Sequence, residues 1–224
     1  AGARIIGAKL HAVTINGDLQ LFGASLIVSG GLTLNGTLTL GNGSSQGGTL
    51  RFDDTAIQTL GGSATVLFDS TVAPTSNSIT AWSGVSLTIA PSVTIRGSNG
   101  SVQALSNASS TIINQGTIFS EVTGREIALV GDGAFTNEGL VRADNGGLLS
   151  VWIPVTNAAG TFQIGASSLL ALNDPLSGGI INTTAGARII GAKLHAVTIN
   201  GELQLIGASL IVSGVLTLNG TLTL

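Results

Sequence analysis

Two adjacent carboxylates, Asp53 and Asp54, are the first candidates for chemistry in this sequence, because they follow the strand-like run TLRF at 49–52. Paired carboxylates can hold a metal ion or cleave glycosidic bonds by acid–base chemistry. The same place also suits a polar turn, and adjacent residues of a strand point to opposite faces, so the two carboxylates need not converge. Because Arg51 is the one basic residue close in sequence, we favour the turn.

The histidines and a glycine–aspartate segment are weaker candidates. His11 and His195 lack sequence neighbours that could complete a triad or a metal site. His11 shares strand parity with Val13 and Ile15, which predicts a structural place at the edge of an apolar interior. The segment GDGAFTNEG at 131–139 is similar to calcium loops, but those loops repeat in tandem and this segment occurs once.

Threonine and tryptophan offer surface chemistry. Thr37 and Thr39 form a Thr-x-Thr pair of the kind that orders water on ice-binding solenoids, but such a surface needs the pair in many coils. Trp82 and Trp152 are isolated and could stack on sugars or simply cover a corner. We therefore expect no catalytic residue, no metal site and no cofactor.

The elements that must position these residues belong to a long repeat. Residues 185–224 reproduce residues 1–40 at a constant offset of 184, with Asp18 replaced by Glu202, Phe22 by Ile206 and Gly31 by Val215. We interpret residues 1–184 as one full repeat unit and residues 185–224 as the start of the next, without a domain boundary between them. A chain that restarts in this way is typical of a tandem array.

Composition excludes several classes of protein. Charged residues make up 8% of the 224 residues and the net charge is −3, so the chain lacks the clustered cations of a nucleic-acid-binding protein. Hydrophobic residues make up 43%, which argues against disorder. Cysteine is absent, which excludes disulfides and thiol catalysis and is compatible with secretion. The charge-free stretch 203–224 alternates with period two and is interrupted by Gly and Asn, so we expect no membrane span.

Short apolar runs separated by turn residues recur along the whole chain and predict strands. Examples are HAVTI at 11–15, TLTL at 37–40, ATVLF at 64–68 and TFQI at 161–164. Many runs end in Asn followed by Gly, both of which tolerate left-handed corners. Asparagines at the same corner of successive coils can form a hydrogen-bonded ladder. The predicted corner and ladder residues are Asn16, Gly17, Asn35, Gly36, Asn114, Gly116, Asn137, Gly139, Asn157, Asn182, Asn200 and Gly201.

This spacing predicts an all-β parallel β-helix, or β-solenoid, with about nine coils of roughly twenty residues in each 184-residue repeat. Alternate residues should point into a narrow apolar interior, and each coil should pair with the coil before it. Residues 55–105 are less regular, and the sequence does not phase their coils.

The coil motif and the long imperfect repeat resemble bacterial surface β-solenoids of the filamentous-haemagglutinin and autotransporter-passenger type, and the giant tandem-repeat fibre proteins of bacterial envelopes. The resemblance covers the whole chain in style, without a motif that fixes one family. It implies a right-handed helix, secretion to the cell surface, and a role as a stalk, adhesin or matrix fibre.

From these observations we expect a structural protein that forms an extracellular bacterial fibre, stalk or matrix filament. An adhesin stalk whose binding tip lies outside this sequence is an alternative, and a carbohydrate-active β-helix enzyme is a more remote one. The expected partners are further copies of the protein, end to end and with lateral bundling as an option, and surface polysaccharide is another candidate. We expect neither nucleic acid nor a cofactor.

Overall fold

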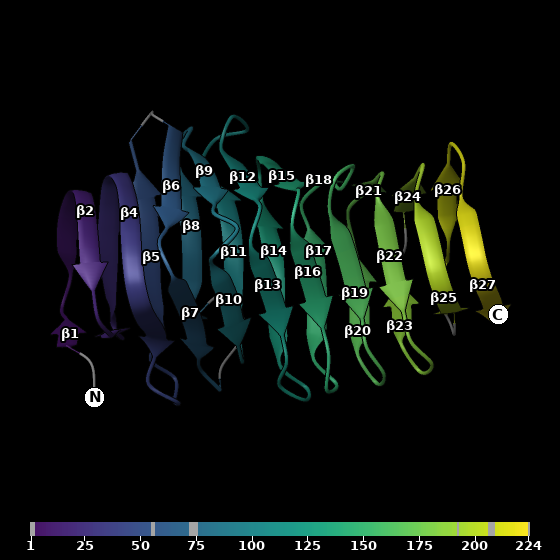
Figure 1. The fold of residues 1–224 in the computed structure, drawn as a ribbon, viewed down its shortest axis with the longest axis horizontal. Coiled ribbons are helices and arrows are strands. Elements are labelled where there is room, and N and C mark those ends of the chain that lie inside the picture. Colours follow the sequence, from purple (N-terminus) through teal and green to yellow (C-terminus); the bar gives the residue numbers. More distant parts are fainter. Residues whose placement is uncertain (1–2, 55–56, 72–75, 192, 206–208, 224) are drawn as a thin grey trace.

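The chain winds into a parallel β-helix whose laps follow one another along the long axis of the molecule (Figure 1). The structure is a computed structural model and describes residues 3–54, 57–71, 76–191, 193–205 and 209–223. These residues form 27 strands and no helix, and every pairing between the strands is parallel. The predicted all-β solenoid is therefore confirmed.

The strands stack in three columns, which form three faces of the helix and follow one another along the chain in each lap. The first face holds part of β2 (Ala8–Asn16), part of β4 (Ala24–Gly41), β5 (Gly48–Asp53), β8 (Ser78–Trp82), β11 (Gly100–Leu105), β14 (Glu126–Gly131), β17 (Leu148–Trp152), β20 (Leu169–Leu172) and β23 (Arg188–Ile190).

The second face takes the remainder of β2 and the next part of β4. Above these lie β6 (Ile57–Gly61), β9 (Ser86–Ile89), β12 (Thr111–Asn114), β15 (Ala134–Asn137), β18 (Val155–Thr156), β21 (Leu176–Ser177), β24 (Lys193–His195) and β26 (Ile211–Ser213).

The third face begins with β1 (Ala3–Ile5) and β3 (Leu19–Leu21) and includes the end of β4. It continues through β7 (Ala64–Asp69), β10 (Thr94–Gly97), β13 (Thr117–Ser120), β16 (Leu140–Ala143), β19 (Thr161–Ile164), β22 (Ile180–Thr183), β25 (Thr198–Gln204) and β27 (Thr217–Thr223).

Inward-pointing side chains stack in columns of their own and form one continuous apolar core. On the first face the inward column runs through consecutive laps and is entirely buried. Its members are Leu26, Leu50, Ile79, Val102, Leu129, Val151 and Leu172. Phe52, Phe68, Phe135 and Phe162 fill wider parts of the same interior and are also buried. The period-two pattern of the sequence thus becomes an interior of stacked apolar residues, as burial of apolar surface favours.

Lap length is uneven along the chain. Paired residues on the first face are 18 positions apart at Leu10 and Val28, and 29 apart at Leu50 and Ile79. One of the longer laps carries the polar connection at residues 42–47. This variation explains why residues 55–105 show no steady period in the sequence.

The strands that carry the histidines occupy different faces in the two copies of the forty-residue segment. The strand that carries His11 lies on the first face, and its counterpart with His195 lies on the second. Along the first face the helix makes eight turns between β2 and β23, and one face later it reaches β24. Counted at this strand, one repeat is eight turns and one face, slightly fewer than the nine coils expected.

Candidate functional site

The acidic pair lies where β5 (Gly48–Asp53) ends. Asp53 ends β5 and forms an ion pair with Arg51, whose guanidinium lies 4.6 Å above the Trp82 ring of the next lap. Asp54 begins the connection to the second face with a φ of +148°. The two carboxylates belong to a corner, as the favoured turn interpretation expects.

The two histidines lie at a corner, and their side chains do not reach the interior. Each ring Nδ1 lies close to a serine hydroxyl of the following lap, at 3.0 Å for His11 and Ser29 and 3.1 Å for His195 and Ser213. The prediction that His11 lies at the edge of the core is wrong. Ala12 has a φ of +46°, which bends the strand and reverses the inward–outward alternation between His11 and Val13.

The glycine–aspartate segment at 131–139 spans β15 and its corners. Asp132 is exposed, while Glu138 accepts a hydrogen bond from Gln115 in the lap before. Among the residues described, no three His, Asp or Glu side chains come close enough to hold a metal ion.

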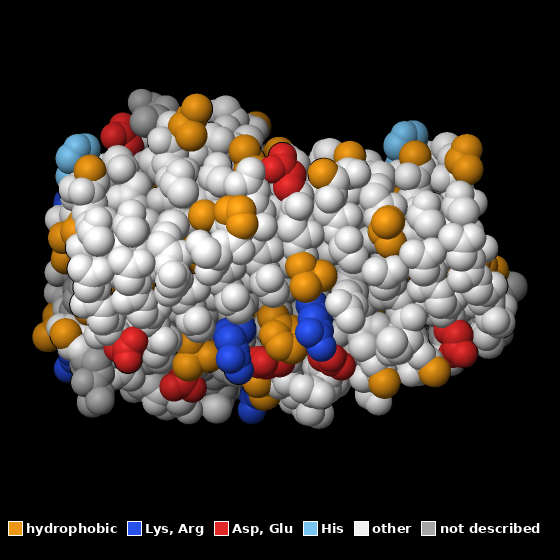
Figure 2. All heavy atoms as spheres, viewed as in Figure 1, with side chains coloured by type: hydrophobic (Ala, Val, Ile, Leu, Met, Phe, Trp, Pro, Cys, Tyr) orange, Lys and Arg blue, Asp and Glu red, His pale blue; other side chains and the backbone are white. Residues whose placement is uncertain are grey.

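On the side of the molecule shown in Figure 2, charged side chains gather most densely near the middle of the helix, and the third face contributes Arg96 and Arg142 from β10 and β16. Arg96, Phe119 and Arg142 are stacked in consecutive laps, with the Arg142 guanidinium 4.6 Å from the Phe119 ring centre. Glu121 pairs with Arg96 and Asp144 with Arg142. The hydrogen bond from Arg142, followed by that from the backbone N–H of Asn145, holds the pKa of Asp144 below its usual value. Each of these two arginines is thus paired with a carboxylate, and the Arg96–Glu121 pair joins two laps.

Outward threonine side chains form one column on the third face. A surface that orders water would need a second threonine column beside it. On the third face threonine occupies one outward position in most laps: Thr37, Thr65, Thr94, Thr117, Thr161, Thr198 and Thr217. The neighbouring outward position holds Thr39 and then Leu67, Arg96 and Phe119. The Thr-x-Thr pair is therefore not repeated in adjacent laps.

Three predicted asparagines form a buried ladder at the corner between the second and third faces. The amide of Asn114 donates to Asn137 at 2.8 Å, and that of Asn137 donates to Asn157 at 2.7 Å. Each of the three is fully buried and also reaches a backbone carbonyl. In the lap before, Ile89 takes the place of Asn114, so the Asn114 Oδ1 at the end of the ladder has no partner among the described residues.

The remaining predicted asparagines form ladders with the opposite polarity. Asn35 donates to Asn16 at 2.8 Å, Asn200 donates to Asn182 at 3.0 Å, and Asn219 donates to Asn200 at 2.9 Å. In these ladders the later lap always donates and the earlier lap accepts. Asn16 and Asn35 lie on the second face, and Asn182, Asn200 and Asn219 lie on the third.

The predicted glycines stand at the corners for two reasons. Gly17 and Gly201 have φ values of +110° and +105°, a left-handed conformation that favours glycine. Gly116 and Gly139 have no such φ, but a Cβ there would meet the backbone of the preceding lap. Gly36 and Gly201 combine both conditions, because a Cβ at either would also meet the backbone of the preceding lap.

Asn77 and Asn99 form a further polar group at the corner between the third and first faces, which sequence reasoning missed. Asn77 accepts from the N–H of Gly48 and donates to the carbonyl of Asn99, whose own Oδ1 accepts from the N–H of Glu126. Both side chains are buried. The signal in the sequence is a Ser-Asn pair that opens a strand, as in SNSIT at 76–80 and SNGSV at 98–102.

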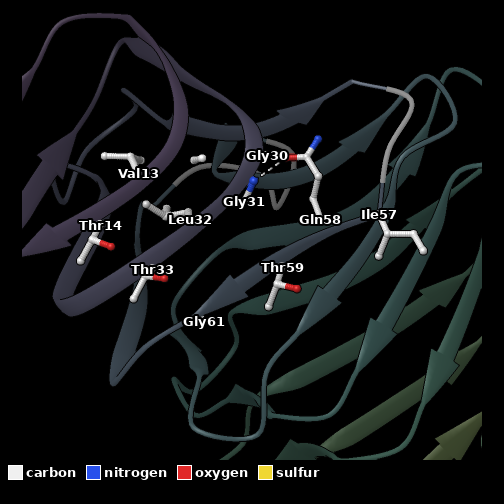
Figure 3. Close-up of a pocket in the computed structure, with 11 residues that line it drawn as sticks. Val13, Thr14, Gly30, Gly31, Leu32, Thr33, Ile57, Gln58, Thr59 and Gly61 are labelled. Carbon is white, nitrogen blue, oxygen red and sulfur yellow. Dashed lines mark hydrogen bonds between the residues drawn. The ribbon is translucent and has the colours of Figure 1, made fainter.

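A hollow of about 310 Å³ is lined by residues of three successive laps, among them Thr14, Thr33 and Thr59 (Figure 3). Gly31 also lines it, and its N–H donates a hydrogen bond to Gln58 of the following lap. The lining has no charged residue, and its polar side chains are three threonines and Gln58. We therefore assign it no ligand.

In the described part of the chain, the first and last laps pair with another lap on one side only. In the last lap Ile211, Val212, Val215 and Leu222 are exposed. In the first lap Leu10, Val13 and Ile15 are only partly buried against the core.

Comparison with known proteins adds no relationship: neither a protein-family model, nor a curated protein, nor a solved structure matches the chain. In the described part of the chain, no helix has the length and apolar character needed to cross a membrane.

Proposed function

We propose that this chain is a structural segment of an extracellular bacterial fibre, stalk or matrix filament built from tandem β-solenoid repeats. The observation that supports this most is the joint between the two repeats. The second copy stacks on the first through the same parallel pairing that the chain uses elsewhere, at β20–β23, β21–β24 and β22–β25.

The joint is as well packed as the rest of the helix. Ile189, Leu194 and Ile199, which begin the second copy, are almost completely buried against the lap that ends the first repeat. Adding a repeat therefore extends one core instead of creating a second domain. Stability in such a helix is close to a sum of contacts between neighbouring laps, so length can increase without a new design.

The character of the surface fits the same role. The carboxylates that could act in catalysis pair with arginines or stand at corners. The outward residues are mostly uncharged, which suits a rod that must stay wettable without binding ions. We place the protein outside the cell because of the resemblance of its coils to surface β-solenoids.

Chains of one, two and three successive repeats test this proposal by electron microscopy. Each added repeat should lengthen a rod of constant width by about 40 Å, because eight turns and one face at about 4.8 Å per lap give that distance. Particles that grow in all directions, or separate beads, would contradict it. Labelling of intact cells with an antibody against the repeat tests the extracellular location.

A further inference from the structure

We infer that two copies of the chain pair side by side through the first face, with their long axes antiparallel, so that Glu126 of each copy meets Arg188 of the other. The inference goes beyond the proposed fibre, because it concerns the side of the helix, which stacking of repeats leaves uncovered. It therefore stands or falls separately from that function.

The first face carries two leucines on its outward side. Leu148 and Leu169 occupy the same outward position in the consecutive strands β17 and β20, and both are partly exposed. Neither belongs to the core, because Leu149 and Leu170 beside them fill the inward positions. Apolar side chains that gather on an outer surface mark an interaction site.

Charges of opposite sign flank the two leucines. In the same outward column Glu126 lies one lap before Leu148, and Arg188 lies one lap after Leu169. Three laps separate the two charges, which is roughly 14 Å at about 4.8 Å per lap, so they cannot pair within one copy. Neither forms an ion pair with another of the described residues. Along the axis the column is therefore Glu, Leu, Leu, Arg.

The next outward column on this face consists of small residues. Ala128, Ser150 and Ala171 point outward and are at most 9% exposed. Beyond them Trp152 ends β17 and is 54% exposed. Small side chains in the middle of the face let a second sheet approach to the usual face-to-face spacing of about 10 Å.

A two-fold axis that runs along the strands, between β17 and β20, makes two such faces complementary. It places Leu148 of each copy over Leu169 of the other, and Ser150 over Ala171. At both ends Glu126 then meets Arg188 of the other copy, so one symmetry operation pairs all four charges. In a parallel two-fold pair each lap would face the same lap of the other copy, and Glu126 would not reach Arg188. The order of the charges therefore favours the antiparallel pair.

Charge exchange tests this contact by analytical ultracentrifugation of the 224-residue chain. Glu126→Arg places two arginines opposite each other at both ends of the contact, and Arg188→Glu places two glutamates there. Each variant alone should dimerise roughly tenfold more weakly than the native chain, because like charges meet. Glu202→Arg makes the same change as Glu126→Arg at an exposed position of the third face, and it should leave dimerisation unchanged.

A mixture of the two weakened variants is the decisive sample. When Glu126→Arg chains pair with Arg188→Glu chains, every arginine at the contact meets a glutamate. The mixture should therefore recover the affinity of the native pair, and the double variant E126R/R188E should recover it alone. Chains that are weakened by misfolding, or that associate through another surface, would not be restored by mixing.

Pulsed electron paramagnetic resonance tests the orientation, because the chain has no native cysteine to compete for a spin label. Ser25→Cys places one label on the first face, five and a half laps from the proposed axis. In an antiparallel pair the two labels should be roughly 50 Å apart, at about 4.8 Å per lap. In a parallel pair they would face each other, close to the sheet spacing of about 10 Å.

A monomeric native chain, single variants that dimerise as well as the native chain, a mixture that does not recover, or a short label distance would each overturn the inference. If the native chain stays monomeric while multi-repeat chains still form lengthening rods, the side contact is wrong and the fibre proposal stands. If the chain pairs as described but added repeats do not lengthen a rod, the fibre proposal fails and the side contact stands.

Discussion

Residues 1–40 and 185–224 are almost the same sequence in two different surroundings. Leu38 is 1% exposed, whereas its counterpart Leu222 is 42% exposed. At the other edge of the segment the order is reversed, since Leu10 is partly buried and its counterpart Leu194 is 2% exposed. The pairings inside each copy are nevertheless the same, as at His11–Ser29 and His195–Ser213. Local sequence thus sets strands and corners, and the neighbouring laps set burial.

The largest expected difference in stability between the two copies is at Leu38 and its counterpart Leu222. Leu38→Ala should lower the free energy of unfolding by about 3 kcal/mol, because it leaves a cavity in a closed core. Leu222→Ala should cost less than about 1 kcal/mol, since much of its surface is already in water. Chemical denaturation followed by circular dichroism measures both.

Leu10 and its counterpart Leu194 provide the control for Leu38 and Leu222. Leu194→Ala should cost about 3 kcal/mol and Leu10→Ala clearly less, because here the second copy is the buried one. If neither Leu194→Ala nor Leu222→Ala lowered the free energy of unfolding, the second copy would be weakly folded throughout. The neighbouring laps would then not explain the difference between the copies.

A natural difference between the copies sharpens the comparison. Gly31 has a φ of +91°, and a Cβ there would lie 3.3 Å from the carbonyl oxygen of Thr59, whereas Val215 is 72% exposed and has no positive φ. Gly31→Val should therefore cost about 2 kcal/mol through backbone strain and crowding. The reverse change, Val215→Gly, should change stability by about 1 kcal/mol or less. Equal effects in thermal unfolding would show that the lap above does not constrain this corner.

The exposed asparagines give a smaller contrast. Asn35 bonds to Asn16 and also accepts from the N–H of Ser63 in the next lap, whereas Asn219 only donates to Asn200. Asn35→Ala should cost about 1 kcal/mol and Asn219→Ala about half as much. Urea unfolding of the two variants and of the double variant would show whether the effects add.

The smallest effect depends on pH and lies on the side of the helix. The pKa of Asp144 is lowered from 3.8, chiefly by the hydrogen bond from Arg142, so its contribution to stability is present above that value. It is lost as the pH falls through the lowered pKa of the folded state. Asp144→Asn should cost up to about 1 kcal/mol at pH 7, and this cost should shrink as the pH falls below 3.8. A cost that does not shrink in acid would mean that packing, not charge, is responsible.

The sequence predicted the strands well where laps are short and alternate strictly, as in TLTL at 37–40 and TFQI at 161–164. It did not predict the strands at 78–82 and 100–105. There the outward residues Thr80 and Gln103 are polar yet buried and bond to each other, so their pattern does not alternate in a recognisable way.

The corner asparagines were recognised by residue type, but their division between two corners could not be. That division, like the face on which each histidine strand lies, depends on the total length of all the preceding laps, which differ in length. A local sequence pattern does not give that total. His11 was placed wrongly for a related reason, because a single positive φ at Ala12 reverses the alternation that sequence reasoning extends through the corner.

Hydrogen exchange tests the central claim most directly, because matching peptides from the two copies have nearly the same intrinsic exchange rates. At concentrations where the chain is monomeric, amides in 25–40 should exchange much more slowly than those in 209–223, which lack a lap on one side. Amides in 198–200 should in turn exchange more slowly than those in 14–16. Equal protection of the two copies at both edges would contradict the account of laps that stabilise one another only through their neighbours.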